Sequence, residues 1–166
     1  IGGGDWSDNR IIPDYIKSIK RKKILKIRSP NSTRPWQHVL EPLYGYLELA
    51  AALKFKKKIH GQSFNFGPEK YANKTVLDVI KEMKKNLLLG NWKVVKVSKN
   101  KGKEAKLLHL NCNKAKKVLK WKSILNFKET IRMVANWYEY YHKNPKGVAS
   151  KTILQIKEYQ NLKNNK

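Results

Sequence analysis

At residues 34–42 the chain carries the run Arg34-Pro35-Trp36-Gln37-His38-Val39-Leu40-Glu41-Pro42. A turn-forming run, residues 29–32, precedes it. A predicted helix follows, because apolar residues recur at helical spacing: Leu43, Leu47, Ala50 and Ala51. Arg34 therefore stands at a loop-to-helix junction, where its guanidinium and the free amides of a helix start both match phosphate oxygens. The alternative is that Arg34 caps the loop and Trp36 is ordinary core.

The segment before this run is predicted to form a helix and a strand. Asp8 or Asn9 can cap a helix that has Pro13 in its first turn, and its apolar face comprises Ile12, Tyr15, Ile16 and Ile19. Arg10 stands beside that helix start, where it is available to an anion. Residues 24–28 are short and β-branched, which indicates a strand that leads into the turn.

The segment after the run alternates between predicted helices and strands. The helix of residues 40–57 is followed by alternating Phe64 and Phe66, which predict a buried strand within residues 62–68. Thr75 and Asp78 have capping-box spacing and open a second helix. Its inward face is predicted to comprise Val76, Val79, Ile80, Met83 and Leu87. Residues 92–97 form another predicted strand, and residues 98–103 form a loop.

Two more helices are predicted in the last third of the chain. The shorter contains Ala115, Val118 and Leu119 and ends near Trp121. The longer begins at Asn126, with Glu129 at its third position, and its inward residues are Phe127, Ile131, Val134, Tyr138 and Tyr141. The cluster Trp137-Tyr138-Tyr140-Tyr141 favours core packing over a platform for stacked bases. We expect residues 1–148 to form the main unit and residues 149–166 a frayed, basic, amphipathic tail.

The charge of the chain is strongly positive. Its 166 residues, 40% of them apolar, are enough for a core. The net charge of +25 is typical of proteins that bind nucleic acid or acidic membranes. However, the lysines are spread over the predicted helices without a DNA- or RNA-binding motif, and a coding bias toward Lys, Asn and Ile explains the charge as well. We therefore expect no nucleic-acid partner.

Other sequence features concern compartment and fold class. Cys112 is the sole cysteine, which excludes an internal disulfide and fits a reducing cytoplasm. No His/Cys set has zinc spacing, so no metal site is expected. No apolar run reaches the ~20 residues that cross a bilayer, and no signal peptide is evident. Strands and helices mix throughout without a glycine-rich dinucleotide fingerprint, which indicates an α/β or α+β fold.

Several segments of the chain together resemble a known family. They are Ile1-Gly2-Gly3-Gly4-Asp5-Trp6, Asp8-Asn9-Arg10 with Ile12-Pro13-Asp14, the run of residues 34–42, Asn65-Phe66-Gly67-Pro68, Leu110 to Ala115 and Leu119-Lys120-Trp121. Their order is the order found in CDP-glucose 4,6-dehydratases, which are extended short-chain dehydrogenase/reductases. The resemblance covers nearly the whole chain, and the run of residues 34–42 is specific to this branch.

The resemblance implies an α/β, Rossmann-type enzyme of which this chain is the C-terminal part, mainly a substrate-binding lobe of helices with short strands. Family enzymes use tightly bound NAD to oxidise the sugar C4 hydroxyl, eliminate water across C5 and C6, and return the hydride to C6. The NAD loop, the catalytic Tyr-x-x-x-Lys pair and the dehydration acid and base would lie before Ile1. No catalytic residue is therefore expected here, and the full-length protein is expected to be a cytoplasmic homo-oligomer.

The resemblance also implies roles in binding CDP-glucose. Arg34 would pair with the diphosphate, helped by Arg10 and by the amides of Ile11 and Ile12. The main chain of Lys26, Ile27 and Arg28 would run beside the cytosine. Glu104 would reach the ribose or diphosphate, although Lys103 stands where the family commonly has His and Asn111 replaces the usual Asp. His38 would be structural, and Cys112 buried and inert.

Two rival hypotheses stay open. The chain could be a stand-alone basic module that binds nucleic acid through its lysines, with affinity that falls steeply with salt. It could also belong to a neighbouring nucleotide-sugar epimerase, dehydratase or decarboxylase, which only the run of residues 34–42 distinguishes.

Overall fold

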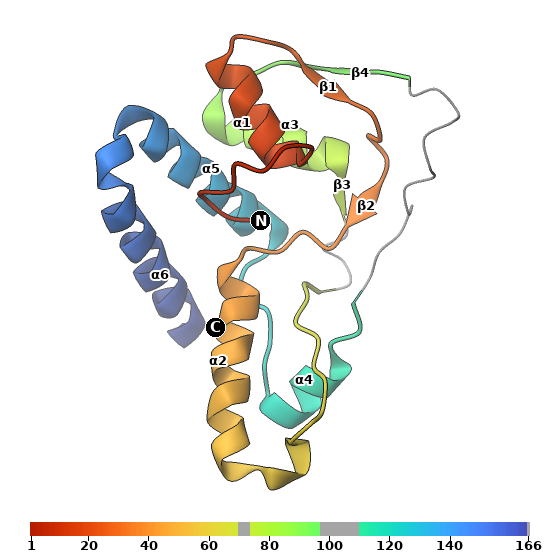
Figure 1. The fold of residues 1–166 in the computed structure, drawn as a ribbon, viewed down its shortest axis with the longest axis vertical. Coiled ribbons are helices and arrows are strands. Elements are labelled where there is room, and N and C mark those ends of the chain that lie inside the picture. Colours follow the sequence, from red (N-terminus) through yellow and green to blue (C-terminus); the bar gives the residue numbers. More distant parts are fainter. Residues whose placement is uncertain (70–73, 97–109, 166) are drawn as a thin grey trace.

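The computed structural model describes residues 1–69, 74–96 and 110–165. Helices and short strands are mixed along the chain (Figure 1). In order, the elements are α1 (Ile11–Lys20), β1 (Leu25–Ile27), β2 (Thr33–Arg34), α2 (Leu40–Phe55), η1 (Lys57–Ile59), β3 (Lys74–Thr75), α3 (Val76–Leu87), β4 (Trp92–Val94), α4 (Asn113–Leu119), α5 (Phe127–Lys143), η3 (Pro145–Gly147) and α6 (Val148–Asn164).

The largest apolar core lies where α1, β1, α3 and α5 meet. Each element contributes at least one almost completely buried side chain, namely Tyr15, Ile27, Ile80 and Val134. The inward positions predicted from the periodicity of α3 and α5 are buried or half-buried in the structure. The spacing of apolar residues therefore identified the faces on which this core is built.

Both predicted capping boxes are present. The Thr75 hydroxyl accepts a hydrogen bond from the Asp78 amide at 3.1 Å, and the Asp78 carboxylate accepts one from the Thr75 amide at 3.0 Å. Asn126 and Glu129 make the same reciprocal pair at 3.0 and 2.7 Å. These contacts satisfy amides that the first helical turn leaves without partners, and so they fix where α3 and α5 begin.

The start of α1 differs from the prediction. The residue before the helix is Arg10, and no side chain caps the helix, so the predicted cap at Asp8 or Asn9 is wrong. Asp8 instead forms an ion pair with Lys17 of α1, 2.5 Å from carboxylate oxygen to amine. The charged lysine thus competes successfully for a carboxylate that could otherwise accept from the helix amides.

The strands in the described part of the chain form two small sheets. β1 pairs in parallel with β4, with Leu25 opposite Trp92, and β2 pairs antiparallel with β3. The strand predicted within residues 62–68 is wrong, since those residues form neither a strand nor a helix. A strand needs a neighbouring strand for its main-chain groups, and the described part of the chain places none beside this segment.

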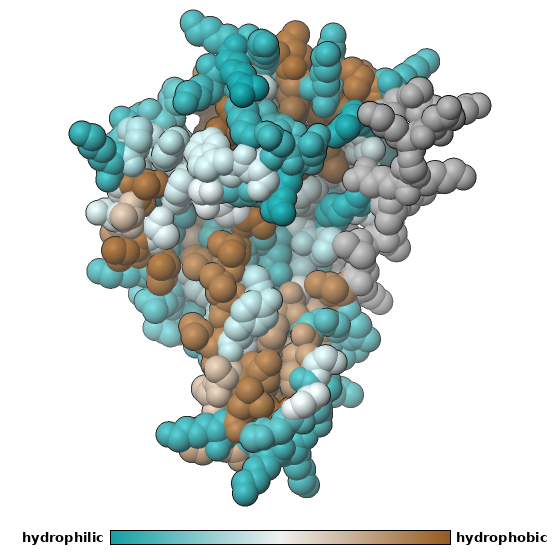
Figure 2. Space-filling view, viewed as in Figure 1, coloured by the Kyte–Doolittle hydropathy of each residue, from teal (hydrophilic) through white to brown (hydrophobic). Residues whose placement is uncertain are grey.

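The apolar face predicted for α2 exists but is exposed. Leu43 is 47% exposed, Leu47 is 71% exposed, and Ala50 and Ala51 are also exposed. Figure 2 shows apolar surface over the lower part of the molecule, where α2 runs in Figure 1. Gly45, on the packed face of α2, lies against the ring of Phe66. Helical spacing identifies an apolar stripe along α2. The side of α2 that faces inward, however, is decided by the close packing of Gly45 against Phe66.

The contact at Gly45 gives a first prediction. A β-carbon added there would lie 2.4 Å from the nearest ring carbon of Phe66. Alanine in a helix is normally better than glycine by about 1 kcal/mol, but overpacking costs about 1–3 kcal/mol. We expect Gly45→Ala to lower the unfolding free energy by up to about 2 kcal/mol in urea denaturation. A stabilised variant would contradict the packing seen here.

The C-terminal segment is a regular helix, so the prediction of a frayed tail is wrong. α6 packs on α5 and buries Gln155, whose amide donates to the Met133 carbonyl oxygen at 2.6 Å. Trp137 of α5 donates through its indole N–H to the Thr152 hydroxyl at 2.9 Å. These contacts tie α6 to the rest of the molecule. The division of the chain at residue 148 stays a prediction.

Candidate functional site

The glycine-rich loop before α1 is shaped by Asp5. Its carboxylate accepts a hydrogen bond from the Ser7 amide at 3.0 Å and forms an ion pair with Arg10 at 3.2 Å. Burial raises the pKa of Asp5, but the hydrogen bonds from Ser7 and Arg10 outweigh it, so the pKa lies below the usual value. Arg10 itself is 67% exposed and stands at the helix start as predicted.

The first turn of α1 presents main-chain amides. The Asp14 amide makes the first helical hydrogen bond, to the Arg10 carbonyl oxygen at 2.9 Å. The amides of Ile11 and Ile12 precede that bond and have no acceptor within the helix, while Pro13 has no N–H. These two amides and Arg10 therefore lie together, in an arrangement that suits an anion.

Arg34 lies on β2, at the other side of the turn that follows β1. It is half-buried, and its guanidinium donates to the Thr33 carbonyl oxygen at 2.8 Å. Trp36 is core, and its indole N–H donates to the Lys74 carbonyl oxygen at 2.7 Å. The core interpretation of Trp36 is thus confirmed. The assignment of Arg34 to a diphosphate stays a prediction.

β1 has one main-chain edge that points away from β4. The Leu25 amide donates to the Asn91 carbonyl oxygen, and the Ile27 carbonyl oxygen accepts from the Val95 amide, both at 2.9 Å. Because successive residues of a parallel strand direct their main-chain groups to opposite sides, those of Lys26 point away from β4. The described residues place no strand on that side, so the Lys26 edge can accept a ligand.

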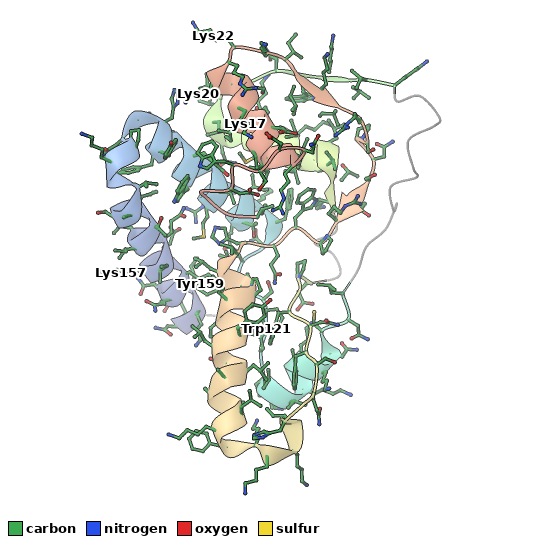
Figure 3. The ribbon with its side chains drawn as sticks, in the orientation of Figure 1. Lys17, Lys20, Lys22, Trp121, Lys157 and Tyr159 are labelled. Carbon is green, nitrogen blue, oxygen red and sulfur yellow. The ribbon has the colours of Figure 1, made fainter. Side chains whose placement is uncertain are left out.

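A basic groove of about 410 Å³ lies between α1 and β1. Its charged lining comprises Lys17, Arg21, Lys23, Lys26 and Arg28 together with Asp8 and Asp14. Figure 3 shows Lys17, Lys20 and Lys22 at this end of the molecule. The excess of cations over carboxylates attracts anions.

The groove brings together only some of the predicted site residues. Lys26 and Arg28 line it, whereas Arg10, Ile11, Ile12, Ile27 and Arg34 do not. Arg28 links the groove to the loop, since its guanidinium lies 3.5 Å from the side-chain oxygen of Asn9. Glu104 and Lys103 fall outside the described residues. Lys17 of α1 and Arg21, which follows the last residue of α1, were missed because an exposed helix surface rich in cations resembles ordinary solvated surface.

The spacing Tyr-x-x-x-Lys occurs once in the chain, at Tyr159 and Lys163. In the structure, Tyr159 is buried between α6 and α2 (Figure 3), and its hydroxyl donates to Glu41 at 3.2 Å. Lys163 pairs with Glu48 at 3.3 Å. Burial and the adjacent Glu41 carboxylate raise the pKa of Tyr159. A proton-abstracting tyrosine needs the opposite shift, so this pair serves packing.

His38 and Cys112 are buried, as predicted. His38 accepts the Leu40 amide at Nδ1, 3.3 Å away, and burial lowers the pKa of His38 to about 4. Burial raises the pKa of the Cys112 thiol. A histidine held neutral and a thiol held protonated are consistent with structural roles.

The described residues offer no site for a metal or for a dinucleotide. No three metal-ligating side chains gather among them. Nor is any described helix both long and apolar enough to cross a membrane. The glycine run at residues 2–4 does not fit a dinucleotide pyrophosphate, because Gly3 is pressed against the ring of Trp137 and leaves no room for a phosphate there. This part of the chain therefore supplies no pyrophosphate cradle for NAD.

Comparison with known proteins gives a sequence relative. No protein-family model matches the chain. The CDP-glucose 4,6-dehydratase of Salmonella typhimurium is 37% identical over 142 residues, which are 84% of this chain and 38% of that protein. The chain thus spans less than half the length of this curated relative.

Solved structures share the fold. The dTDP-glucose 4,6-dehydratase of Bacillus anthracis in complex with NAD has a TM-score of 0.66 and 17% identity, covering 86% of this chain and 43% of that one. The UDP-glucuronic acid 4-epimerase of Bacillus cereus in complex with NAD has a TM-score of 0.65 and 18% identity, covering 84% and 41%. The predicted α/β, Rossmann-type class is confirmed. The chain is therefore similar over most of its length to a CDP-glucose 4,6-dehydratase, and it shares the fold of a nucleotide-sugar dehydratase and an epimerase that were solved in complex with NAD.

Proposed function

We propose that this chain is the C-terminal, nucleotide-sugar-binding part of a CDP-glucose 4,6-dehydratase. The observation that carries the proposal is the 37% identity to the Salmonella typhimurium enzyme. The whole enzyme would convert CDP-glucose to CDP-4-dehydro-6-deoxy-glucose and water through internal hydride transfer by NAD. We further propose a cytoplasmic homo-oligomer that supplies precursors for surface polysaccharide such as O-antigen.

Two parts of the site support the binding role. The amides of Ile11 and Ile12 with Arg10 offer donors and positive charge to a diphosphate, and Arg34 lies on the segment that follows β1. The exposed main-chain edge at Lys26 offers one donor and one acceptor to the edge of a pyrimidine. Glu104 is kept as a proposed contact to the ribose or diphosphate.

Catalysis would come from outside this chain. Two observations support this proposal. Tyr159 is buried, and the glycine run at residues 2–4 does not fit a dinucleotide. We therefore propose that the 166 residues alone bind nucleotide but do not turn over CDP-glucose.

Nucleotide titration of the protein, as its complete gene encodes it, tests the proposal. We expect Arg34→Ala to weaken CDP binding about ten- to 150-fold, because a charged hydrogen bond contributes about 1.5–3 kcal/mol. Arg132→Ala is the matched control, since Arg132 lies on α5 and pairs with Glu158 at 2.7 Å. Equal CDP affinity in the two variants would contradict the proposal.

The basic groove favours one second candidate, a module that binds nucleic acid. That candidate predicts RNA or DNA binding that falls steeply with salt and does not respond to CDP. A preference for UDP or dTDP over CDP in the same titration would instead indicate a neighbouring nucleotide-sugar epimerase or dehydratase.

A further inference from the structure

We infer that Tyr138, on α5, is a positioning residue for the diphosphate-binding end of the site. Its hydroxyl and the aromatic rings around it fix the loop of residues 2–10, which ends at Arg10 and the first turn of α1. The inference rests on the proposed function, because it concerns how that site holds the phosphates of its nucleotide.

The hydroxyl of Tyr138 supplies the first contact. It donates to the Asp5 carbonyl oxygen at 2.6 Å, and the residue is almost completely buried. Burial raises the pKa of Tyr138, so the hydroxyl keeps its proton and remains a donor. The side chain of the same Asp5 holds the Ser7 amide and Arg10. Asp5 thus connects Tyr138 to Arg10 at the start of α1.

Aromatic packing supplies the second contact. The ring of Trp6 meets Tyr138 edge-on, with centroids 5.3 Å apart, and lies 5.0 Å from the ring of Tyr141. Trp137 stacks on Tyr141 at 5.6 Å and 4°. Gly3 is so close to Trp137 that an added β-carbon would lie 2.0 Å from its ring. The loop is therefore pressed against α5 over several residues.

α1 holds the loop from its other side. The Lys17 amine donates to the Trp6 carbonyl oxygen at 2.7 Å and pairs with Asp8. The loop is thus held between α1 and α5, and its last residue leads into the amides of Ile11 and Ile12. Because binding groups must be held within about 0.5 Å of their productive geometry, a looser loop weakens phosphate binding without unfolding the chain.

The substitution Tyr138→Phe tests this role, since it removes the hydroxyl and keeps the ring. We expect the affinity for CDP to fall about five- to tenfold and the affinity for cytidine to stay within twofold, because the loop meets the phosphates and not the nucleoside. In the complete enzyme, the KM for CDP-glucose would rise by the same factor while kcat changes less than twofold. A loss of stability alone does not change the ratio of the CDP affinity to the cytidine affinity, so this ratio distinguishes a positioning role from a structural one.

Tyr159→Phe is the matched control, because it deletes a buried hydroxyl that bonds Glu41 between α6 and α2. We expect it to lower thermal stability while leaving the affinities for both ligands unchanged. If Tyr138→Phe keeps wild-type CDP affinity while Arg34→Ala loses it, or if CDP and cytidine weaken equally, the positioning role is overturned and the proposed function stands. If the wild-type protein does not bind CDP, the proposed function and this inference are overturned together.

Discussion

Replacing Glu41 by alanine is expected to lower the unfolding free energy by about 3–5 kcal/mol. Glu41 is 1% exposed, and one carboxylate oxygen accepts the amides of Ile124 and Leu125 at 2.9 and 2.5 Å. The other accepts the Tyr159 hydroxyl at 3.2 Å. Truncation leaves these three buried donors without an acceptor, at about 1–3 kcal/mol each before water enters the space.

Urea denaturation at neutral pH measures this effect, and Glu48→Ala is its control. Glu48 lies on the same helix, but its carboxylate meets a partly exposed Lys163 at 3.3 Å. An exposed ion pair of this kind contributes about 1 kcal/mol or less, so the control should stay near wild type. Losses of similar size in the two variants would show that the Glu41 contacts do not hold α2 to α6 and to the segment before α5.

Acid is expected to destabilise the protein through His38, by about 3 kcal/mol between pH 6.5 and 4. His38 is 2% exposed, and burial lowers its pKa from 6.5 to about 4. Below pH 6.5 the unfolded chain binds a proton that the folded chain does not. The contribution of His38 to stability is therefore complete above pH 6.5 and is lost as pH falls through about 4.

Measuring the unfolding free energy at pH 7.5 and at pH 4.5 tests whether acid lowers the stability. Burial raises the pKa of Glu41, so Glu41 acts in the opposite direction, and its contribution is lost as pH rises through its folded pKa. Comparison of wild type with His38→Gln isolates the histidine, because Glu41 is common to both. We expect the stability difference between them to shift by about 2–3 kcal/mol over this range. A stability difference between wild type and His38→Gln that does not change with pH would refute the assignment.

The predictable parts of the fold are those with local signals. Thr75 with Asp78 and Asn126 with Glu129 determine helix starts within four residues, so α3 and α5 could be placed from the sequence. The packed face of α2 could not, because it depends on the fit of Gly45 to a ring 21 residues away. The same holds for α6, whose burial depends on Tyr159 reaching Glu41.

In the candidate site, too, some features could be predicted from neighbouring residues, whereas others depend on residues far apart in the sequence. Arg10 beside a helix start was predictable from neighbouring residues, but its pairing with Asp5 was not, because that pairing depends on how the loop is pressed on α5. The exposed main-chain edge at Lys26 follows from the register of β1 with β4, which no local pattern encodes. The basic groove combines cations from two elements, each of which alone resembles solvated surface.

The pairing of β1 with β4 has a consequence for synthesis on the ribosome. Leu25 and Ile27 are made long before Trp92 and Val94, their partners in the described part of the chain. At translation rates of about 5–20 residues per second, the nascent β1 waits roughly 3 to 13 seconds for β4 to emerge. Lys23, Lys26 and Arg28 flank its apolar residues during that wait. Their mutual repulsion opposes pairing between neighbouring nascent chains, so the cations that shape the groove also protect the strand against aggregation.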